Sequence, residues 1–261
     1  MTTRTPEMDS HPVLPGCEPW SSPGGGPHGV LVLHGFTGSP VSMRPLGEAL
    51  ADAGFVVELP RLPGHGTDPA DLALTTWDDW LAEAERAFGV LRTRTPEGRV
   101  LVAGLSMGGA LTLAMAEAHP ELAGIICINA PTQAPPELAE GIRQMLEGGV
   151  DIIDSIGGDI ADPDADEASY DATPLRPLLS MIDAGEAVRG RLGEIRCPAL
   201  IITSRQDHVV TPTDSDVIAE AVGGPVERLW LEKSFHVATL DYDRAEVEAT
   251  AVAFAQRAVA S

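Results

Sequence analysis

A serine between two glycines, in Gly104-Leu105-Ser106-Met107-Gly108, is the pattern in this chain with the clearest chemical potential. A serine hydroxyl becomes a nucleophile when a base takes its proton and a carboxylate orients that base. Glycine and serine are also common in ordinary turns, so these five residues alone do not separate a nucleophile from a plain glycine-rich turn. An apolar segment precedes the pattern and an alanine- and leucine-rich segment follows it. This context predicts a strand, a sharp turn and a helix, with Ser106 exposed at the turn.

The base that such a serine needs is a histidine, and the chain contains seven. In an open parallel sheet, ligands bind beyond the carboxyl ends of the strands, so a catalytic histidine should follow a strand closely. His236 follows the apolar segment RLWLEKS and meets this condition. His119 lies at a predicted helix end, and His11 and His28 lie in the N-terminal segment. We therefore predict that His236 is the base, against the alternative of an ordinary surface or core histidine.

The orienting carboxylate is predicted to be Asp207, which follows the apolar segment ALIITSRQ. Its neighbour His208 is a poor partner, because adjacent residues rarely aim their side chains at each other. Asp207 orienting His236 is geometrically easier. The resulting order along the chain, Ser106, Asp207, His236, resembles that of the α/β-hydrolases.

A tetrahedral intermediate of acyl transfer also needs hydrogen-bond donors aimed at its oxyanion. Met107 follows the serine at a predicted helix N-terminus, where backbone N–H groups are free and the helix dipole favours negative charge. The second donor is predicted to be the backbone N–H of Phe36, in a loop that His34 and Gly35 shape. His34 and His65 are interpreted as structural hydrogen-bonding residues.

The elements that must position these residues alternate along the chain. Apolar segments bounded by glycine, proline or polar residues predict buried strands, and apolar residues recurring at three and four positions predict helices. This alternation predicts a mostly parallel central sheet with helices on both faces. The predicted strands cover 30–33, 55–59, 99–105, 125–128, 197–203 and 227–231, and the predicted helices include one that Thr76 caps, one near 214–222 and one over 244–259.

The alternation stops after Asn129 and resumes at Cys197. Between 131 and 191 there is no clear strand, and the stretch between Arg143 and Arg176 holds nine carboxylates and no basic residue. We interpret 131–190 as a cap inserted into a core of 11–130 and 191–261. Residues 1–10 are expected to be disordered, and 11–20 could form a short hairpin.

The composition of the chain restricts the kinds of partner that it could bind. The net charge of −22 disfavours nucleic acid and tight binding to anionic membranes, so a small neutral substrate is expected. Cys127 and Cys197 lie in apolar segments and are interpreted as buried hydrophobic residues rather than ligands. The acidic stretch DPDADE lacks the spacing and central glycine of a calcium loop, so no metal is expected, and no cofactor. With no apolar run long enough for a membrane span and no signal peptide, a cytoplasmic protein is expected.

Longer strings in the chain resemble bacterial monoacylglycerol lipases and the closely related carboxylesterases of the α/β-hydrolase superfamily. The resemblance runs from about Pro12 to the last helix, and PRLPGHGTD and SFHVATLDYD are far more specific than the glycine-serine pattern. It implies an α/β-hydrolase fold with a small cap inserted after the sixth strand. It also implies a triad of Ser106, Asp207 and His236, and an oxyanion hole formed by the backbone of Phe36 and Met107. The other strings are VLVLHGFTGSPVSMRPL, TTWDDWLA, GLSMGGALTLAMAEAHPELAGI and PALIITSRQDHVV.

The resemblance further identifies 152–174 with the family's small cap, which covers an acyl tunnel and an alcohol site. It implies that Glu167 contacts the glycerol hydroxyls and that Ile156 lines the alcohol end of the site. The other interpretation of Glu167 is a solvated carboxylate in an acidic run. The small residues Ala168 and Ser169, which follow it, depart from the family pattern and leave the preferred alcohol open.

Together these observations predict a serine hydrolase that cleaves monoacylglycerols or other medium-chain neutral esters through an acyl-enzyme. Other reactions of the same triad remain open, namely haloperoxidase-like chemistry, C–C or amide hydrolysis, and acyl transfer. A non-catalytic receptor with a vestigial triad is a further alternative, because fold does not fix function. The expected enzyme is a monomer or homodimer without stable membrane insertion, and its cap could touch a membrane transiently.

Overall fold

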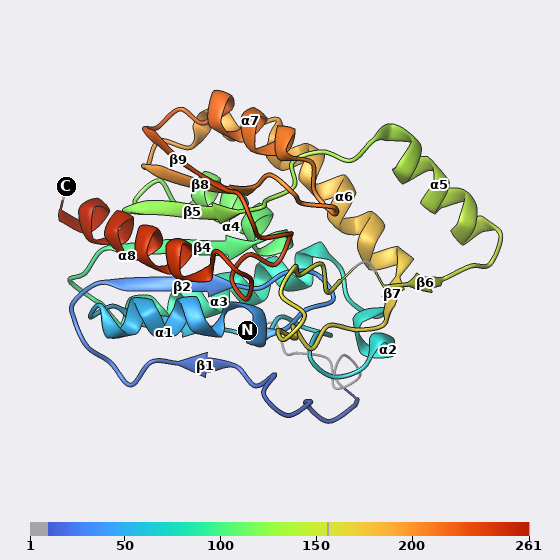
Figure 1. Ribbon diagram of the computed structural model, residues 1–261, viewed down its shortest axis with the longest axis horizontal. Coiled ribbons are helices and arrows are strands. Elements are labelled where there is room, and N and C mark those ends of the chain that lie inside the picture. The colour runs from blue at the N-terminus through green and yellow to red at the C-terminus, as the bar shows by residue number, and fades with distance from the viewer. Residues whose placement is uncertain (1–9, 156, 261) are drawn as a thin grey trace.

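A central sheet forms the middle layer of the computed structural model, which describes residues 10–155 and 157–260. Its order is β1-β3-β2-β4-β5-β8-β9, and every pair is parallel except β1 with β3 (Figure 1). The predicted mostly parallel sheet is therefore confirmed. The strands are β1 (Trp20–Ser21), β2 (Gly29–Leu33), β3 (Val56–Leu59), β4 (Val100–Leu105), β5 (Gly124–Ile128), β8 (Ala199–Ser204) and β9 (Val226–Leu231).

Helices cover both faces of this sheet because successive strand residues point to opposite sides. Along β2, Val30 and Val32 pack with α1 (Arg44–Asp52) and α8 (Arg244–Ala260). Leu31 and Leu33 belong to the second core cluster, with α3 (Trp77–Arg94), α4 (Met107–Ala118) and α7 (Pro212–Ala221). The two core clusters therefore pack against opposite faces of the sheet. The carboxyl ends of the parallel strands all point to one end of the molecule (Figure 1).

Helix α3 begins where the capping residue Thr76 predicts that it should. The Thr76 side chain accepts the N–H of Asp79, and the Asp79 carboxylate accepts the N–H of Thr76 at 2.9 Å, which makes a capping box at the start of α3. Three shorter elements complete the core: η1 (Pro40–Met43), α2 (Pro69–Leu72) and η2 (Leu192–Glu194).

The excursion between β5 and β8 contains helices and a small strand pair. Its elements are α5 (Pro136–Glu147), β6 (Ile152–Asp154), β7 (Ala172–Pro174) and α6 (Leu175–Arg189). The expectation of no strand here was wrong, because β6 and β7 pair antiparallel. Each has only three residues, and β6 is largely exposed, so no apolar pattern announced it. Figure 1 shows α5 standing out from the body beyond the carboxyl ends of the sheet.

The N-terminal segment differs from the suggested hairpin. Instead of two strands over 11–20, it contributes only β1, which pairs with β3. Three prolines at 12, 15 and 19 lack the N–H groups that a hairpin ladder requires. The strand before the cap is consequently the fifth along the described chain rather than the sixth. The disorder expected for residues 1–10 falls on residues outside those described, except Ser10, whose N–H and hydroxyl both bond to Asp71.

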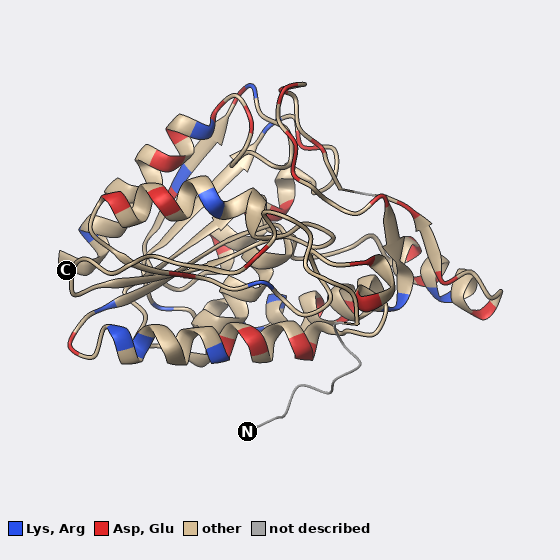
Figure 2. Ribbon diagram, turned by 90° about the horizontal axis from the view of Figure 1, so that it is seen from below, with Lys and Arg blue, Asp and Glu red and all other residues tan. Residues whose placement is uncertain are grey.

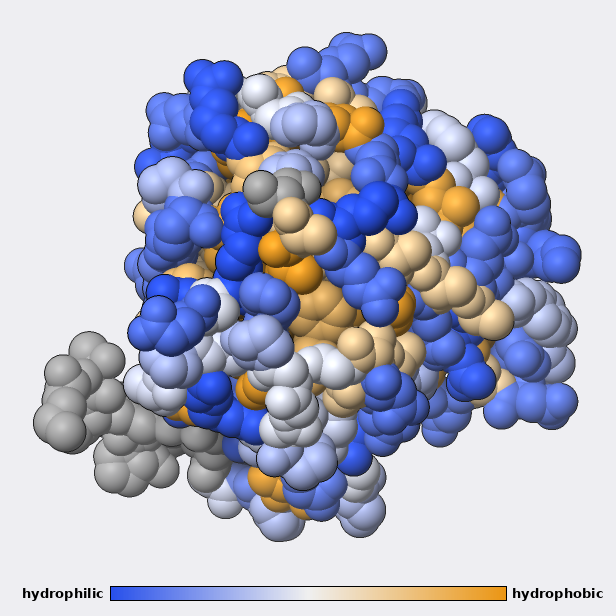
Figure 3. Space-filling view, turned by 90° about the vertical axis from the view of Figure 1, so that its left-hand side faces the viewer, coloured by the Kyte–Doolittle hydropathy of each residue, from blue (hydrophilic) through white to orange (hydrophobic). Residues whose placement is uncertain are grey.

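The surface carries the acidic character of the sequence. Acidic residues occur on helices and loops throughout the molecule (Figure 2). The end at which the chain terminates, opposite α5, is mostly hydrophilic with a small apolar area at its centre (Figure 3). The three cysteines are free and buried, which confirms Cys127 and Cys197 as core residues. Within 10–155 and 157–260, no helix is long and apolar enough to cross a membrane.

Candidate active site

Ser106 lies at a strained turn between β4 and α4. Its φ of 53° and ψ of −121° put a residue with a side chain in a region that such residues rarely adopt, at a cost of about 1–3 kcal/mol. The Ser106 N–H donates to the carbonyl of Ile128 at 2.9 Å, which ties the turn to the neighbouring strand. The turn therefore projects the serine beyond the carboxyl edge of the sheet.

The two glycines of the pattern allow strand and helix to approach closely at this turn. A Cβ on Gly104 would lie 2.0 Å from the carbonyl oxygen of Gly108, and a Cβ on Gly108 would lie 2.2 Å from that of Leu33. Real side chains do not reach such distances, so only glycine fits at either position. Leu33 ends β2, and Gly108 therefore also sets the spacing between Ser106 and the loop that follows β2.

The structure places Asp207 and His236 side by side at the ends of two neighbouring strands. His236 Nδ1 lies 2.8 Å from Asp207 Oδ2, and both side chains are at least nine-tenths buried. The other oxygen, Asp207 Oδ1, accepts the backbone N–H groups of Val209 and Val210, each at 2.8 Å. Asp207 pairs with His236 and not with its neighbour His208, as the sequence argument expected. The carboxylate is held by the chain and can in turn hold the imidazole.

The loop after β2 lies directly against the serine. A Cβ on Gly35 would be 3.4 Å from Ser106 Cβ and 4.0 Å from Ser106 Oγ, so Gly35 leaves room for the hydroxyl. Phe36 follows in the same loop, and Met107 is the first residue of α4, where a backbone N–H has no partner within the helix. These are the two positions predicted to supply oxyanion donors.

His34 and His65 support this loop, as predicted for structural histidines. His34 Nε2 accepts the N–H of Leu62 at 3.1 Å, and its Nδ1 lies 2.9 Å from the carbonyl of Gly35. Burial lowers the pKa of His34 to about 4, so the ring is neutral at ordinary pH and can accept that N–H. His65 is fully buried with a lowered pKa and bonds the carbonyl of Pro63 at 3.0 Å.

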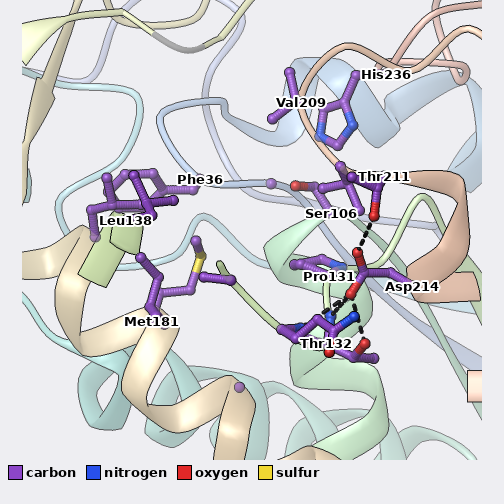
Figure 4. Close-up of a pocket in the computed structure, with 18 of the residues that line it drawn as sticks. Phe36, Ser106, Pro131, Thr132, Leu138, Met181, Val209, Thr211, Asp214 and His236 are labelled. Atoms are coloured by element: carbon purple, nitrogen blue, oxygen red, sulfur yellow. Dashed lines mark hydrogen bonds between the residues drawn. The ribbon is translucent and has the colours of Figure 1, made fainter. Parts of the chain in front are cut away.

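A cavity of about 790 Å³ opens from Ser106 towards the cap. Ser106, His236 and Val209 lie on one side of it, while Leu138 of α5 and Met181 of α6 lie on the other (Figure 4). The remaining lining is mostly apolar, and α5, α6 and β6 contribute Ile142, Met145, Ile153, Leu178 and Ile182 to it. The size and the apolar lining with few polar groups are typical of a small-molecule site.

Comparison with known proteins identifies the family. The model of the alpha/beta hydrolase family matches residues 30–250. The chain belongs to the alpha/beta hydrolase family.

Two curated relatives and a solved structure show where this hydrolase lies within the family. It is 45% identical over 240 residues to a thermostable monoacylglycerol lipase of Bacillus sp. (strain H-257), a match that covers 90% of this chain and 93% of the relative. It is 29% identical to a carboxylesterase of Bacillus subtilis (strain 168), over 84% of this chain and 89% of that protein. A structure reported for the metagenome-derived lipolytic enzymes LipS and LipT superimposes with a TM-score of 0.90 at 42% identity, covering 94% of this chain and all of that one.

Glu167 lies inside the hydrolase rather than on its surface. It is 4% exposed, lines the cavity, and its Oε2 accepts the N–H of Gly158 at 3.1 Å. A solvated carboxylate is therefore excluded. Burial raises the pKa of Glu167, while the N–H of Gly158 and the nearby His236 act against that shift. Ile156, the other predicted alcohol-site residue, lies outside the described residues.

The loop PRLPGHGTD, part of the family resemblance, holds the cap in place. Tyr170 of the cap donates its hydroxyl to the carbonyl of Gly64 at 2.8 Å and accepts the N–H of Thr67 at 2.8 Å. Its backbone N–H donates to the carbonyl of Thr37, beside Phe36, at 3.1 Å. One cap residue thus joins this loop to the predicted oxyanion loop.

Two residues near the site were missed in the sequence. Asn129, with φ of 46°, donates Nδ2 to the carbonyl of His236 at 2.7 Å and accepts the N–H of Ser204 at 2.8 Å. Asp214 lines the cavity and accepts the N–H and hydroxyl of Thr132, at 2.9 and 2.7 Å. A polar residue directly after a buried strand was a signal for Asn129. Asp214, at the start of a helix, carried no comparable signal.

Proposed function

We propose that this hydrolase cleaves carboxylic esters through an acyl-enzyme on Ser106, with monoacylglycerols or other medium-chain neutral esters as substrates. The observation that carries the proposal is the strained Ser106 turn at the head of a largely apolar cavity, which His236, bonded to Asp207, also lines. The names of the two curated relatives, a monoacylglycerol lipase and a carboxylesterase, support the same reaction.

In the proposed reaction, Ser106 Oγ attacks the ester carbonyl while His236 Nε2 takes the serine proton. The backbone N–H groups of Phe36 and Met107 stabilise the negative charge on the tetrahedral oxygen. His236 then gives the proton to the leaving alcohol, which breaks the ester bond and leaves the acyl group on Ser106. Water, deprotonated by His236, then attacks the acyl-enzyme, and His236 returns that proton to Ser106 Oγ as the bond to the acyl group breaks and the acid is released. No cofactor enters this sequence of steps.

Asp207 fixes the imidazole for these proton transfers. With Nδ1 bonded to Asp207 at 2.8 Å, the proton on that nitrogen is held and Nε2 is free to face the serine. The negative carboxylate also stabilises the imidazolium that forms while the proton is on the ring. Because Val209 and Val210 hold the other carboxylate oxygen, Asp207 has little freedom to turn away.

Substrate preference follows from the rest of the cavity. Apolar side chains of α5 and α6 suit an acyl chain, and burial of each methylene contributes about 0.8 kcal/mol. Glu167 is proposed to accept hydrogen bonds from the hydroxyls of the alcohol. The net charge of −22 favours a neutral ester over an anionic one. A cytoplasmic location, a monomeric or homodimeric state and transient membrane contact through the cap stay predictions.

The decisive test is Ser106→Ala, assayed on 1-monolauroylglycerol and on p-nitrophenyl caprylate. We expect a loss of at least about 10⁴-fold in kcat for both esters, with an unchanged thermal unfolding transition that shows an intact fold. Asp207→Asn should lower kcat about 10⁴-fold, because asparagine favours the wrong imidazole tautomer. Substantial turnover by the Ser106 variant contradicts the proposal.

A substrate panel then separates the reactions that one triad can perform. Monoacylglycerol should be cleaved faster than diacylglycerol and triacylglycerol, and esters faster than lipid-like amides. Preferred cleavage of triacylglycerol would show that the small cap does not restrict the head group. Preferred cleavage of the amide would assign another reaction to the same residues.

A further inference from the structure

One carboxylate of the cap is bonded to the loops that carry both His236 and Asp207. Asp159 Oδ2 accepts the backbone N–H of His236 at 3.1 Å and that of His208 at 3.2 Å. Its Oδ1 lies 2.9 Å from His208 Nδ1, and its backbone carbonyl accepts the N–H of Val237 at 3.1 Å. His208 directly follows Asp207 in the chain, so Asp159 contacts both loops at once.

The peptide groups on either side of the His236 Cα are therefore held from two directions. Asn129, at the end of β5, bonds the His236 carbonyl at 2.7 Å, and Asp159 bonds the His236 N–H. The first bond comes from the core and the second from the cap, 77 residues away in sequence. Because the imidazole is attached to this backbone, its position relative to Ser106 depends on both bonds.

We propose that Asp159 is a positioning residue for the catalytic histidine, so that the cap contributes to proton transfer as well as to substrate binding. This inference rests on the proposed function of Ser106, Asp207 and His236. A misplacement of about 1 Å in a reacting group can reduce the rate about a hundredfold. Loss of the bond from Asp159 to the His236 N–H therefore acts on kcat, and less on substrate affinity.

The same short stretch also carries the predicted alcohol site. Glu167 Oε2 accepts the N–H of Gly158, the residue just before Asp159. Gly158 and Asp159 are consecutive residues of the cap. They thus connect Glu167, which would bind the head group, with His236, which would protonate the leaving oxygen. The segment 157–171 links recognition of the alcohol to the position of His236.

A second anchor keeps the segment in place when Asp159 is changed. Asp241 Oδ2 accepts the N–H of Ala161 and that of Phe235, each at 2.8 Å, and its Oδ1 accepts the N–H of Asp162 at 3.1 Å. Substitution of Asp159 therefore removes the bond to His236 without freeing the segment from the core. The effect of substituting Asp159 therefore reports on the position of His236 and not on a loss of the segment's structure.

The test compares Asp159→Ala, Asp159→Asn and Asp164→Ala in the full chain, with p-nitrophenyl caprylate as substrate. Asp159→Ala should lower kcat about ten- to a hundredfold with KM within about twofold of the wild-type value. Asparagine should restore kcat to within about threefold of wild type, because its side-chain oxygen can accept both backbone N–H groups. Asp164 is an exposed carboxylate of the same segment, and its alanine variant controls for the loss of one negative charge.

A spectroscopic readout separates positioning from a loss of structure. The proton between His236 Nδ1 and Asp207 is expected to give a strongly deshielded signal in the proton NMR spectrum, and this signal should weaken in Asp159→Ala and persist in Asp159→Asn and Asp164→Ala. The inference is overturned if Asp159→Ala has the kcat of Asp164→Ala, if it changes KM alone, or if asparagine is as impaired as alanine. The failure of the proposed function is distinct, since Ser106→Ala would then remain active whatever Asp159 does.

Discussion

The two sides of the cavity are built in different ways. The catalytic wall, formed by Phe36, Ser106 and His236, stands beyond the carboxyl ends of parallel strands, and Asp207 is bonded to His236. The acyl wall, formed by Leu138, Ile142, Met145, Met181 and Ile182, comes from α5 and α6 of the cap. A hydrogen bond joins Asp207 and His236 at 2.8 Å, whereas the acyl wall consists of apolar side chains that pack without direction.

This difference separates the residues that carry out the proposed reaction from the residues that select the substrate. Directional bonds and close glycine contacts hold the catalytic wall, so small changes there should have large effects. Flexible apolar side chains tolerate substitution at constant volume, so changes in the acyl wall should alter substrate preference and leave the fold intact. Matched substitutions in and around the two walls test this difference.

The largest contrast is expected for glycine-to-alanine substitutions. A Cβ on Gly108 would lie 2.2 Å from the Leu33 carbonyl oxygen, and Gly108→Ala should lower the free energy of unfolding by about 3 kcal/mol or more. A Cβ on Gly141 of α5 meets no atom within 4 Å, and Gly141→Ala should raise that free energy by up to about 1 kcal/mol. Urea unfolding curves measure both. Equal midpoints for the two variants would contradict the contrast between the walls.

A moderate effect is expected from filling the acyl wall. Met181→Trp reduces the space for an acyl chain, so the ratio of kcat/KM for laurate over butyrate esters should fall about tenfold or more, as burial of two or more methylenes is lost. The matched variant Met181→Leu conserves volume and should keep the wild-type ratio. If Met181→Trp keeps the wild-type preference for laurate esters, the acyl chain lies elsewhere in the cavity.

The smallest effect concerns the pH dependence of stability at Glu167, a buried carboxyl group of the cavity lining. Burial raises the pKa of Glu167 in the folded state above the ordinary value of 4.5. The neutral carboxyl group therefore contributes to stability below pH 4.5, and this contribution is lost as the pH rises through the raised pKa. Glu167→Gln cannot ionise, so its stability relative to wild type should increase as pH rises from about 5 to about 8. Thermal unfolding across that range measures the difference.

A control for this prediction exists in the same cap. Glu147 is exposed at the end of α5, and Glu147→Gln should show no such increase with pH. A constant difference between wild type and Glu167→Gln at every pH would mean that Glu167 keeps its charge in the folded protein at little cost.

The catalytic wall was far more predictable from sequence than the cap. Buried strands leave continuous apolar runs, and the glycines around Ser106 are demanded by contacts within one short turn, so both leave local signals. The polar residue after each strand could then be placed at a common edge. The sequence therefore predicts the pairing of Asp207 with His236, and their 2.8 Å contact agrees with that prediction.

The cap could not be predicted in the same way because its contacts are long-range. Asp159 is one of nine carboxylates in an acidic stretch, and nothing in its neighbours marks it as the partner of His236. The strands β6 and β7, each of three residues, are too short to show a periodicity. The preference for an alcohol likewise depends on how the segment 157–171 folds over the serine, which local patterns do not encode.

The central claim, that Ser106 is an activated nucleophile, is tested most directly by labelling with a fluorophosphonate followed by peptide mass mapping. We expect one label per chain, on Ser106, formed in parallel with the loss of esterase activity. His236→Ala should slow the labelling by at least about a hundredfold, because the serine loses its base. A label on another residue, or an unlabelled Ser106 in a protein that still hydrolyses esters, would contradict the account.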